Sequence, residues 1–492
     1  MVEKVLYRLL EDADKLLVRG ENVPQELINN IKKYTAGGSY VGLAQINTMS
    51  GNLQYNSNKI SNYIKYASNI CLDKIIFPEL SLVGFPLEDT VYRHPSLAKE
   101  CIKYLKEIAK ITTSTNVVLG FVEPIDGDEN LFYNSIAILF NGEIQGLVRK
   151  SLFVSKPITK DNYYFEKYYD NRILAPENLC KKNIIDNFEI KYSFDNSSFL
   201  IGDDLFIESS KDNDVLKFDE SNYIVNSIFA PSFDTQNMIS YNKVSNSAKK
   251  LGLPIIQVNS VGANDGFSFD GLSTVYNNDG SILARAKAFE EQLLVAEIDQ
   301  KIGKVYDMPL GYVSVPEKKS AFSLDYSLEM ERLYKTLVQG IRDYFKKCGL
   351  SRAVLGLSGG LDSTISAVLC ADAIGKENVL GISMPSHITT KESKNDAEVL
   401  AKNLGINFLE YSIKPMIDVT TSCTNDIFNN VSKTWGKYWD KENACFSNSI
   451  SNTPVSFTPD NIQARSRAMY LWSVSNEFSS CIPIATSDKS EL

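Results

Sequence analysis

Apolar residues recur along this chain with two different spacings, and these spacings predict its secondary structure. In residues 1–33 they stand at helical intervals among charged residues, which predicts one or two amphipathic helices. From residue 40 onward, short apolar runs alternate with helical stretches, and helices are expected near 55–69 and 96–112. Such repetition of strands and helices is typical of α/β layering.

Two turn signals interrupt this alternation. Asn141-Gly142 stands between two runs with strand-like alternation, and Asp279-Gly280 stands between two more. An Asn-Gly or Asp-Gly pair readily adopts the positive φ angles of a tight hairpin turn. The sequence therefore predicts antiparallel hairpins at both places, and a sheet in which parallel and antiparallel strands are mixed.

The pattern changes again after residue 302, which indicates a boundary between domains. Residues 303–325 lose their periodicity and collect Gly and Pro, which is typical of a linker. A chain of 492 residues also exceeds the roughly 100 to 200 residues of a usual domain. We therefore expect a helical extension at 1–38, one α/β domain at 39–302 and a second domain at 326–492.

Composition and charge exclude several classes of function. The hydrophobic share of 43% and the charged share of 23% are ordinary for a folded globular protein. A net charge of −9 repels a phosphate backbone, so nucleic acid is not an expected partner. The eight cysteines have no CxxC spacing, so neither a zinc site nor a disulfide framework is indicated. No apolar run suits a signal peptide or a membrane span, which predicts a cytoplasmic protein without a membrane partner.

The strongest chemical signal is a glycine-rich run between an apolar strand-like segment and a helix. Gly359 and Gly360 allow successive backbone N–H groups to converge on an anion, and the positive end of the following helix favours a pyrophosphate there. Asp362 is a candidate magnesium ligand. A capped Gly-Gly turn before a core helix is the structural alternative. The candidate phosphate-binding residues are Gly356, Leu357, Ser358, Gly359, Gly360, Leu361, Asp362, Ser363 and Thr364.

The run lacks the lysine of a Walker loop and instead resembles the SGGxDS loop of ATP pyrophosphatases. That superfamily includes NAD, GMP, asparagine and argininosuccinate synthetases, so the loop alone leaves the substrate open. Three later stretches, at 381–406, 460–476 and 485–492, together resemble NAD synthetases in order and spacing. The resemblance implies ATP and Mg²⁺ as cofactors and deamido-NAD as the acid substrate. It also implies an acyl-adenylate that ammonia attacks.

The same resemblance assigns further site residues. It places Met384 beside the adenosine, makes Thr486 part of the nucleotide site and makes Glu491 a second metal ligand with Asp362. Taken singly, the stretch 384–386 is equally compatible with a strand that ends at a proline turn, and the stretch 460–476 is equally compatible with an amphipathic core helix. The residues that the resemblance places near the dinucleotide are Asn461, Gln463 and Arg465.

Residues 40–300 resemble the nitrilase-type amidase domain, a carbon-nitrogen hydrolase, that precedes the synthetase in glutamine-dependent NAD synthetases. That family uses a Glu-Lys-Cys triad to release ammonia from glutamine. The resemblance places Glu79 at the general base, Lys150 at the lysine and Glu166 at a second glutamate. The cysteine position, however, reads Gly202. Glycine cannot form a thioester, so the glutaminase half is predicted to be inactive.

Three more positions of the glutamine pocket depart from the family. A tyrosine position reads Lys156, a serine position reads Ala230 and a basic position reads Gln236. Losses that cluster in one pocket favour natural decay of glutaminase chemistry over a single sequence change. Glu79 and Lys150 then have a structural alternative, because they can persist as a buried ion pair that is costly to break.

The resemblance implies a nitrilase-like α-β-β-α sandwich followed by a doubly wound parallel-sheet domain of the adenine nucleotide alpha hydrolase type. It also implies a homo-oligomer. Because the resembling family continues beyond the position of Leu492, we expect the second domain to be incomplete at its C-terminus. Two rival functions stay open: a non-catalytic relative or fragment that serves as an oligomer subunit, and another ATP pyrophosphatase amidotransferase.

Overall fold

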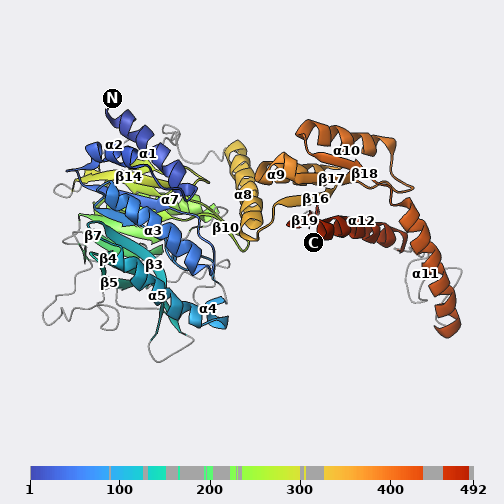
Figure 1. Ribbon diagram of the computed structural model, residues 1–492, viewed down its shortest axis with the longest axis horizontal. Coiled ribbons are helices and arrows are strands. Elements are labelled where there is room, and N and C mark those ends of the chain that lie inside the picture. Colours follow the sequence, from blue (N-terminus) through green and yellow to red (C-terminus); the bar gives the residue numbers. More distant parts are fainter. Residues whose placement is uncertain are drawn as a thin grey trace. The chain divides into compact units, whose positions relative to one another are not determined.

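The computed structural model divides by contact into two compact units, Met1–Gly340 and Ile341–Leu492 (Figure 1). Of the predicted linker at 303–325, only Lys304 and Val305 are described. No helix among the described residues is long and apolar enough to cross a membrane. The described residues are 2–87, 90–125, 131–150, 165–166, 193–194, 197–202, 205, 222–228, 230, 235–299, 304–305, 326–435 and 458–486.

The N-terminal extension forms two helices, as predicted, α1 (Val2–Val18) and α2 (Gln25–Thr35). Both turn an apolar stripe toward the first unit, because their apolar residues recur at helical spacing. On α1, the carboxylate of Asp14 accepts the backbone N–H of Leu293 at 2.8 Å. The side chains that the two helices bury are Leu6, Leu10, Ala13, Leu17, Ile28 and Ile31.

Asp14 makes the stability of this region depend on pH. Burial raises the pKa of Asp14 from 3.8 to about 7, with Glu291 and Glu290 adding to the rise and Leu293 and Lys287 opposing it. The folded protein therefore prefers the protonated acid, so the stabilisation is complete below about pH 4 and is lost as the pH rises to about 7. We expect the thermal unfolding midpoint to fall across this window. In Asp14→Asn the midpoint should depend less on pH, and this variant should be more stable than the unchanged protein above pH 7. If the midpoint of Asp14→Asn depended on pH as steeply as that of the unchanged protein, Asp14 would not be the group responsible.

The first sheet has the strand order β15-β14-β1-β2-β3-β4-β5. Parallel pairing joins β1, β2 and β3, whereas β14, β4 and β5 pair antiparallel, so the predicted mixed sheet is confirmed. Helices α3 (Leu53–Asn69) and α5 (Ser96–Lys110) pack against it, and the short α4 (Thr90–Arg93) precedes α5. The strands are β1 (Tyr40–Gln45), β2 (Lys74–Ile76), β3 (Asn116–Pro124), β4 (Phe132–Phe140), β5 (Glu143–Arg149), β14 (Gln292–Asp299) and β15 (Lys304–Val305).

Both predicted hairpins are confirmed. Asn141 and Gly142 link β4 to β5 with φ angles of 48° and 81°, as a tight turn with two positive φ values requires. The second hairpin joins β12 to β13 through a longer loop that contains Gly280, whose φ is 81°. A Cβ atom on Gly280 would lie 2.5 Å from the carbonyl oxygen of Ser245, so the close approach also requires glycine.

A second sheet, ordered β13-β12-β9-β8-β7-β6, faces the first. Along β8, Val225 packs into the core shared with the first sheet, whereas Ile224 packs with Val244 of helix α7 (Thr235–Leu251). Alternate residues of β8 therefore serve two layers, which confirms the α-β-β-α sandwich (Figure 1). The remaining strands are β6 (Ser193–Phe194), β7 (Ser197–Ile201), β8 (Tyr223–Ile228), β9 (Ile255–Asn259), β10 (Val261–Asn264), β11 (Phe267–Asp270), β12 (Thr274–Tyr276) and β13 (Ile282–Arg285).

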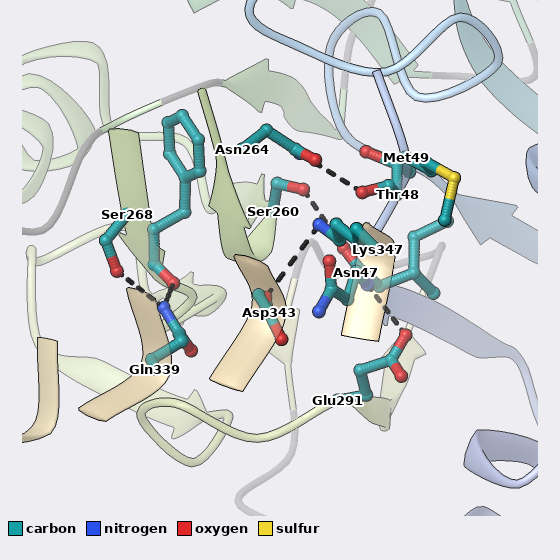
Figure 2. A network of polar contacts seen from close by, with 12 residues as sticks. Asn47, Thr48, Met49, Ser260, Asn264, Ser268, Glu291, Gln339, Asp343 and Lys347 are labelled. Atoms are coloured by element: carbon teal, nitrogen blue, oxygen red, sulfur yellow. Dashed lines mark hydrogen bonds and ion pairs between the residues drawn. The ribbon is translucent and has the colours of Figure 1, made fainter. Parts of the chain in front are cut away.

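The first part of helix α8 (Tyr326–Lys347) belongs to the sandwich unit through polar contacts. Arg332 forms an ion pair with Asp270, whose side chain is fully buried. Figure 2 shows Gln339, whose amide donates to the hydroxyl of Ser268 at 2.7 Å. The sandwich therefore holds α8 by its polar side.

The second unit is a parallel sheet in the order β18-β17-β16-β19. Helices α9 (Leu361–Ile374) and α10 (Lys391–Leu404) pack on one face and α12 (Thr458–Glu477) on the other, with α11 (Lys414–Trp435) against α12 (Figure 1). Helices on both faces of a parallel sheet confirm the doubly wound fold. The strands are β16 (Arg352–Gly356), β17 (Val379–Ser383), β18 (Asn407–Glu410) and β19 (Cys481–Ile484), and a 3₁₀ turn spans Lys376–Asn378.

The strand order makes the carboxyl end of β16 a topological switch point. From β16 the chain moves outward through β17 to β18, and it then returns to place β19 on the other side of β16. In open parallel sheets, ligands bind in the crevice outside the carboxyl ends of the strands at such a point. The predicted phosphate loop begins directly after β16.

Candidate functional site

Hydroxyl groups fix the conformation of the loop after β16. The hydroxyl of Ser358 accepts the N–H of Gly360 at 3.2 Å and lies 3.1 Å from the hydroxyl of Ser363. The hydroxyls of Ser363 and Thr364 both donate to the carbonyl oxygen of Gly360, at 3.0 and 2.8 Å. These contacts hold Gly360 at the N-cap of α9.

The start of α9 has backbone N–H groups that no carbonyl oxygen of the helix accepts. The first turn closes with the N–H of Thr364 donating to Gly360 at 3.2 Å, so the N–H groups of Leu361, Asp362 and Ser363 have no acceptor within the helix. Gly360, Leu361 and Asp362 are exposed, and Leu361 is 71% exposed. An exposed helix N-terminus after a glycine loop favours the binding of an anion.

Position 359 of this loop requires glycine. Its φ is 82°, and a Cβ atom there would lie 2.5 Å from the carbonyl oxygen of Ser393 on α10. We expect Gly359→Ala to destabilise the second unit and to weaken nucleotide binding, measured by thermal unfolding and calorimetry. The control is Gly340→Ala on α8, where nothing lies within 4 Å and alanine should stabilise the helix by about 0.5–1 kcal/mol. Equal behaviour of the two variants would contradict the role of Gly359.

The other residues assigned to the nucleotide lie in different surroundings. Continuing the register of β16 and β19 past Leu355 and Ile484 brings Thr486 alongside Leu357, at the same sheet edge as the loop. Met384 is 6% exposed and packs in a core cluster, so its side chain belongs to the interior. Glu491 lies outside the described residues.

The residues assigned to the dinucleotide share the first turns of α12 but not one face. Arg465 donates to the side chain of Asn461 at 2.7 Å, one turn apart. Gln463 is two residues from each, so helix geometry directs it elsewhere. Of the three residues, Asn461 and Arg465 are therefore the two whose side chains contact each other.

A magnesium ion fits the donors at the loop when phosphate supplies the rest of its shell. Asp362 offers an exposed carboxylate beside the free N–H groups. Within the part of the chain that the structure describes, no group of three or more His, Cys, Asp or Glu side chains could hold a metal. Magnesium commonly uses one or two carboxylates plus substrate phosphates and water, so Asp362 suits that mode.

In the sandwich, Glu79 and Lys150 meet although they are far apart in sequence. Glu79 lies in the turn after β2, Lys150 follows β5, and their charged atoms are 2.6 Å apart. The two residues are 2% and 5% exposed. Asn134 on β4 donates to the same carboxylate oxygen at 2.7 Å. The sequence analysis missed Asn134, although an asparagine within the apolar run of β4 was a signal.

Gly202 stands where a side chain would enter this pair. It follows β7 directly and has a φ of 58°. A Cβ atom on Gly202 would lie 2.9 Å from the Nζ atom of Lys150 and 3.2 Å from the Oε2 atom of Glu79. The position assigned to the nucleophile therefore faces the assigned base and lysine and carries no reactive group.

Of the remaining predicted residues of this half, the structure describes the surroundings of Glu166 and Ala230. Glu166 is exposed, and its backbone N–H donates to Phe132 at 2.8 Å. Ala230 exchanges hydrogen bonds with Asn259 through its backbone. Gln236 lies on α7 and Lys156 lies outside the described residues.

Fold and site together define a two-domain α/β protein, in which a nitrilase-type sandwich precedes a doubly wound domain with a glycine loop at its switch point. Residues 239–307 match the carbon-nitrogen hydrolase family, and residues 333–492 match the NAD synthase family. Among curated proteins, the chain is 30% identical over 459 residues to the glutamine-dependent NAD(+) synthetase of Synechocystis sp., covering 92% of this chain and 74% of that one. It is 31% identical over 468 residues to that of Aquifex aeolicus, covering 91% and 75%.

The chain therefore belongs to the glutamine-dependent NAD(+) synthetase family. Solved structures agree. The NAD+ synthetase of Acinetobacter baumannii in complex with ADP is 26% identical with a TM-score of 0.70, and the match covers 92% of this chain and 75% of that one. A second glutamine-dependent enzyme, from Cytophaga hutchinsonii, shares the fold at 18% identity with a TM-score of 0.69 and the same coverage.

Proposed function

We propose that this chain catalyses the ATP-dependent amidation of deamido-NAD to NAD and takes the nitrogen from ammonia. The observation that carries the proposal is Gly202, which faces the Glu79–Lys150 pair and carries no nucleophile. The loop at the start of α9, in contrast, keeps N–H groups that have no acceptor in the helix. Membership of the family supports the synthetase chemistry. The complex of the Acinetobacter baumannii relative with ADP supports a nucleotide site.

The loop suits the first chemical step. The pyridine carboxylate of deamido-NAD attacks the α-phosphorus of ATP, an acyl-adenylate forms, and pyrophosphate leaves with its negative charge. The free N–H groups of Leu361, Asp362 and Ser363 and the dipole of α9 stabilise that charge. Magnesium held through Asp362 would neutralise part of it. Ammonia then attacks the acyl carbon, and AMP leaves.

Among the described residues of the sandwich, the position assigned to the nucleophile is Gly202, which cannot release that ammonia from glutamine by the family route. Amide cleavage by the family route needs a thiolate that attacks the carbonyl carbon and forms a thioester. Glu79 has no thiol to deprotonate at Gly202, and its Oε1 atom already accepts hydrogen bonds from Lys150 and Asn134. We assign the pair a structural role.

For the domain organisation we propose a nitrilase-like domain at 39–302 and a synthetase domain at 326–492. The family matches at 239–307 and 333–492 support both. The site residues carried over from the family, including Thr486, Asn461 and Arg465, are part of this proposal.

Titration calorimetry with ATP tests the nucleotide site. The proposal expects binding that requires magnesium and that Gly359→Ala weakens. The rival reading, a non-catalytic subunit, predicts no binding at all. Release of pyrophosphate then identifies the acid substrate: the proposal expects it with deamido-NAD and not with xanthosine monophosphate, whereas a GMP synthetase would show the reverse.

A further inference from the structure

A small cavity lies in the sandwich unit where helix α1 packs near the start of β14 (Figure 1). Its volume is about 30 Å³, and one water molecule needs roughly 10–15 Å³, so the cavity has room for one or two particles of that size. Residues of α1 and of the segment 287–295 line it. Those with ionisable side chains are Glu11, Asp14, Lys287, Glu290 and Glu291.

The lysines around this cavity neutralise only part of its acidic lining. Lys287 is shared between two carboxylates, at 3.3 Å from Glu11 and 3.7 Å from Glu290. Glu291 is paired with a lysine of α3 at 2.6 Å. Asp14 forms no ion pair with any residue that the structure describes. Once Asp14 is ionised, the cavity therefore has negative charge in excess.

Two buried tyrosines of α3 face the same acids. Tyr63 and Tyr66 are 1% and 4% exposed, and their hydroxyl groups have no hydrogen-bond partner among the described residues. Burial raises the pKa of Tyr63 well above its usual value, and the charges of Asp14 and Glu291 raise it further. Burial and Asp14 also raise the pKa of Tyr66. A carboxylate has this effect on a phenol only from nearby, so both hydroxyls lie toward the acidic lining of the cavity.

The cavity also offers free carboxylate oxygens. One oxygen of Asp14 accepts the N–H of Leu293 at 2.8 Å, and one oxygen of Glu291 accepts the N–H of Asn47 at 2.7 Å. The second oxygen of each carboxylate accepts no hydrogen bond from the part of the chain that the structure describes. Buried acceptors and hydroxyls that stay unbonded cost free energy, so a ligand that bonds them is stabilised there.

We propose that the cavity binds an ammonium ion through the free oxygens of Asp14 and Glu291 and the hydroxyl of Tyr63. Ammonium is about as large as water, donates hydrogen bonds and supplies the missing positive charge. Water fits the volume but leaves the charge uncompensated. Within the described residues, no group of three or more His, Cys, Asp or Glu side chains could hold a metal ion instead. The proposal does not rest on the proposed function, because the cavity contains none of the residues assigned to chemistry.

Ammonium binding should depend on pH, because the ion competes with a proton on Asp14. The pKa of Asp14 is about 7 in the folded protein, so the acid is mostly neutral below that pH. Ammonium favours the ionised form, so binding releases the proton of Asp14 to solvent. The affinity should therefore rise by up to about tenfold per pH unit below pH 7 and level off above it. The groups that face Asp14 are Lys287, Glu290 and Glu291 from the segment before β14, and Tyr63 and Tyr66 from α3.

Thermal unfolding of the full chain, without ATP and deamido-NAD, tests the site. At pH 8, ammonium chloride should raise the midpoint by a few degrees in a saturable way, whereas tetramethylammonium chloride of equal ionic strength should not. At pH 5 the rise should be much smaller. Asp14→Asn should abolish it. The control Asp12→Asn should retain it, because Asp12 is 64% exposed on the same helix, pairs with Lys15 and does not line the cavity.

Three outcomes of that experiment would overturn the proposal. Equal rises with tetramethylammonium would show an effect of ionic strength. Potassium chloride that matched ammonium chloride would show a site for metal cations and not for a hydrogen-bond donor. A rise that persisted in Asp14→Asn would place the ion elsewhere in the chain.

Proton release gives a second measurement. When protein and ammonium chloride solutions of matched pH 7 are mixed, up to about half a proton per chain should be released, because half of the Asp14 side chains are protonated at that pH. Tyr63→Phe keeps the buried ring and removes the hydroxyl, so half-maximal release should need a severalfold higher ammonium concentration. Absence of release from the unchanged protein, or an unchanged titration in folded Tyr63→Phe, would refute the site.

Discussion

Asp362→Asn should weaken magnesium-dependent ATP binding and lower the rate of NAD formation by about a hundredfold or more, the range seen when one charge-stabilising group is removed from an active site. Asp362 lies exposed on the first turn of α9, beside N–H groups that have no acceptor in the helix. Asparagine preserves the size of the side chain and removes the charge that holds magnesium. Calorimetry with and without magnesium separates the loss of metal binding from the loss of nucleotide binding.

Asp372→Asn is the matched control for this prediction. Asp372 is exposed on the same helix, ten residues further on and therefore about 15 Å away. The control should bind ATP as the unchanged protein does. If Asp362→Asn retained full magnesium-dependent binding, the phosphate site would have to lie elsewhere.

The second large effect concerns the buried pair of the sandwich. Lys150→Met removes the lysine ammonium from the carboxylate of Glu79, which is 2% exposed, so the free energy of unfolding should fall by about 3–5 kcal/mol. The double variant Glu79→Gln, Lys150→Met should recover much of that loss, because it removes both charges of the pair. Denaturant unfolding measures both. Since the pair is assigned no chemistry, the rate of NAD formation from ammonium should be unchanged wherever the variants are folded.

Lys394→Met supplies the comparison, because Lys394 and Glu410 are also paired, at 3.0 Å, but are exposed. Breaking that pair should cost less than about 1 kcal/mol. A loss for Lys150→Met as small as that of the control would mean that Glu79 is solvated or protonated. A lower ammonium-dependent rate in folded Lys150→Met would contradict a purely structural role.

Local rules predicted much of the fold. The Asn141-Gly142 turn follows from backbone sterics alone, because a tight hairpin needs positive φ at both positions. The helix after the glycine run and the helices of the N-terminal extension follow from periodicity. The convergence of Glu79, Lys150 and Gly202 was predicted only through the family resemblance, because it depends on strands that are distant in sequence.

Features that depend on packing between distant segments were not predictable in this way. Asn134 reads as one polar residue in an apolar strand, and only the structure shows that it supports Glu79. The assignment of Met384 to the nucleotide stays a prediction, and the sequence did not show that its side chain also packs in the core of the second unit. Helix α8 contacts the sandwich through Arg332 and Gln339, and helical periodicity alone cannot tell that this polar face is the one that meets the protein.

The source of the amide nitrogen tests the central claim most directly. The full chain is incubated with deamido-NAD, ATP, magnesium, unlabelled ammonium and glutamine labelled with ¹⁵N in its side-chain amide, and the NAD formed is analysed by mass spectrometry. We predict unlabelled NAD, and no NAD when ammonium is omitted. Label in the product above the level from spontaneous glutamine breakdown would contradict an inactive glutaminase site at Gly202. A failure to form NAD with ammonium would contradict the synthetase assignment.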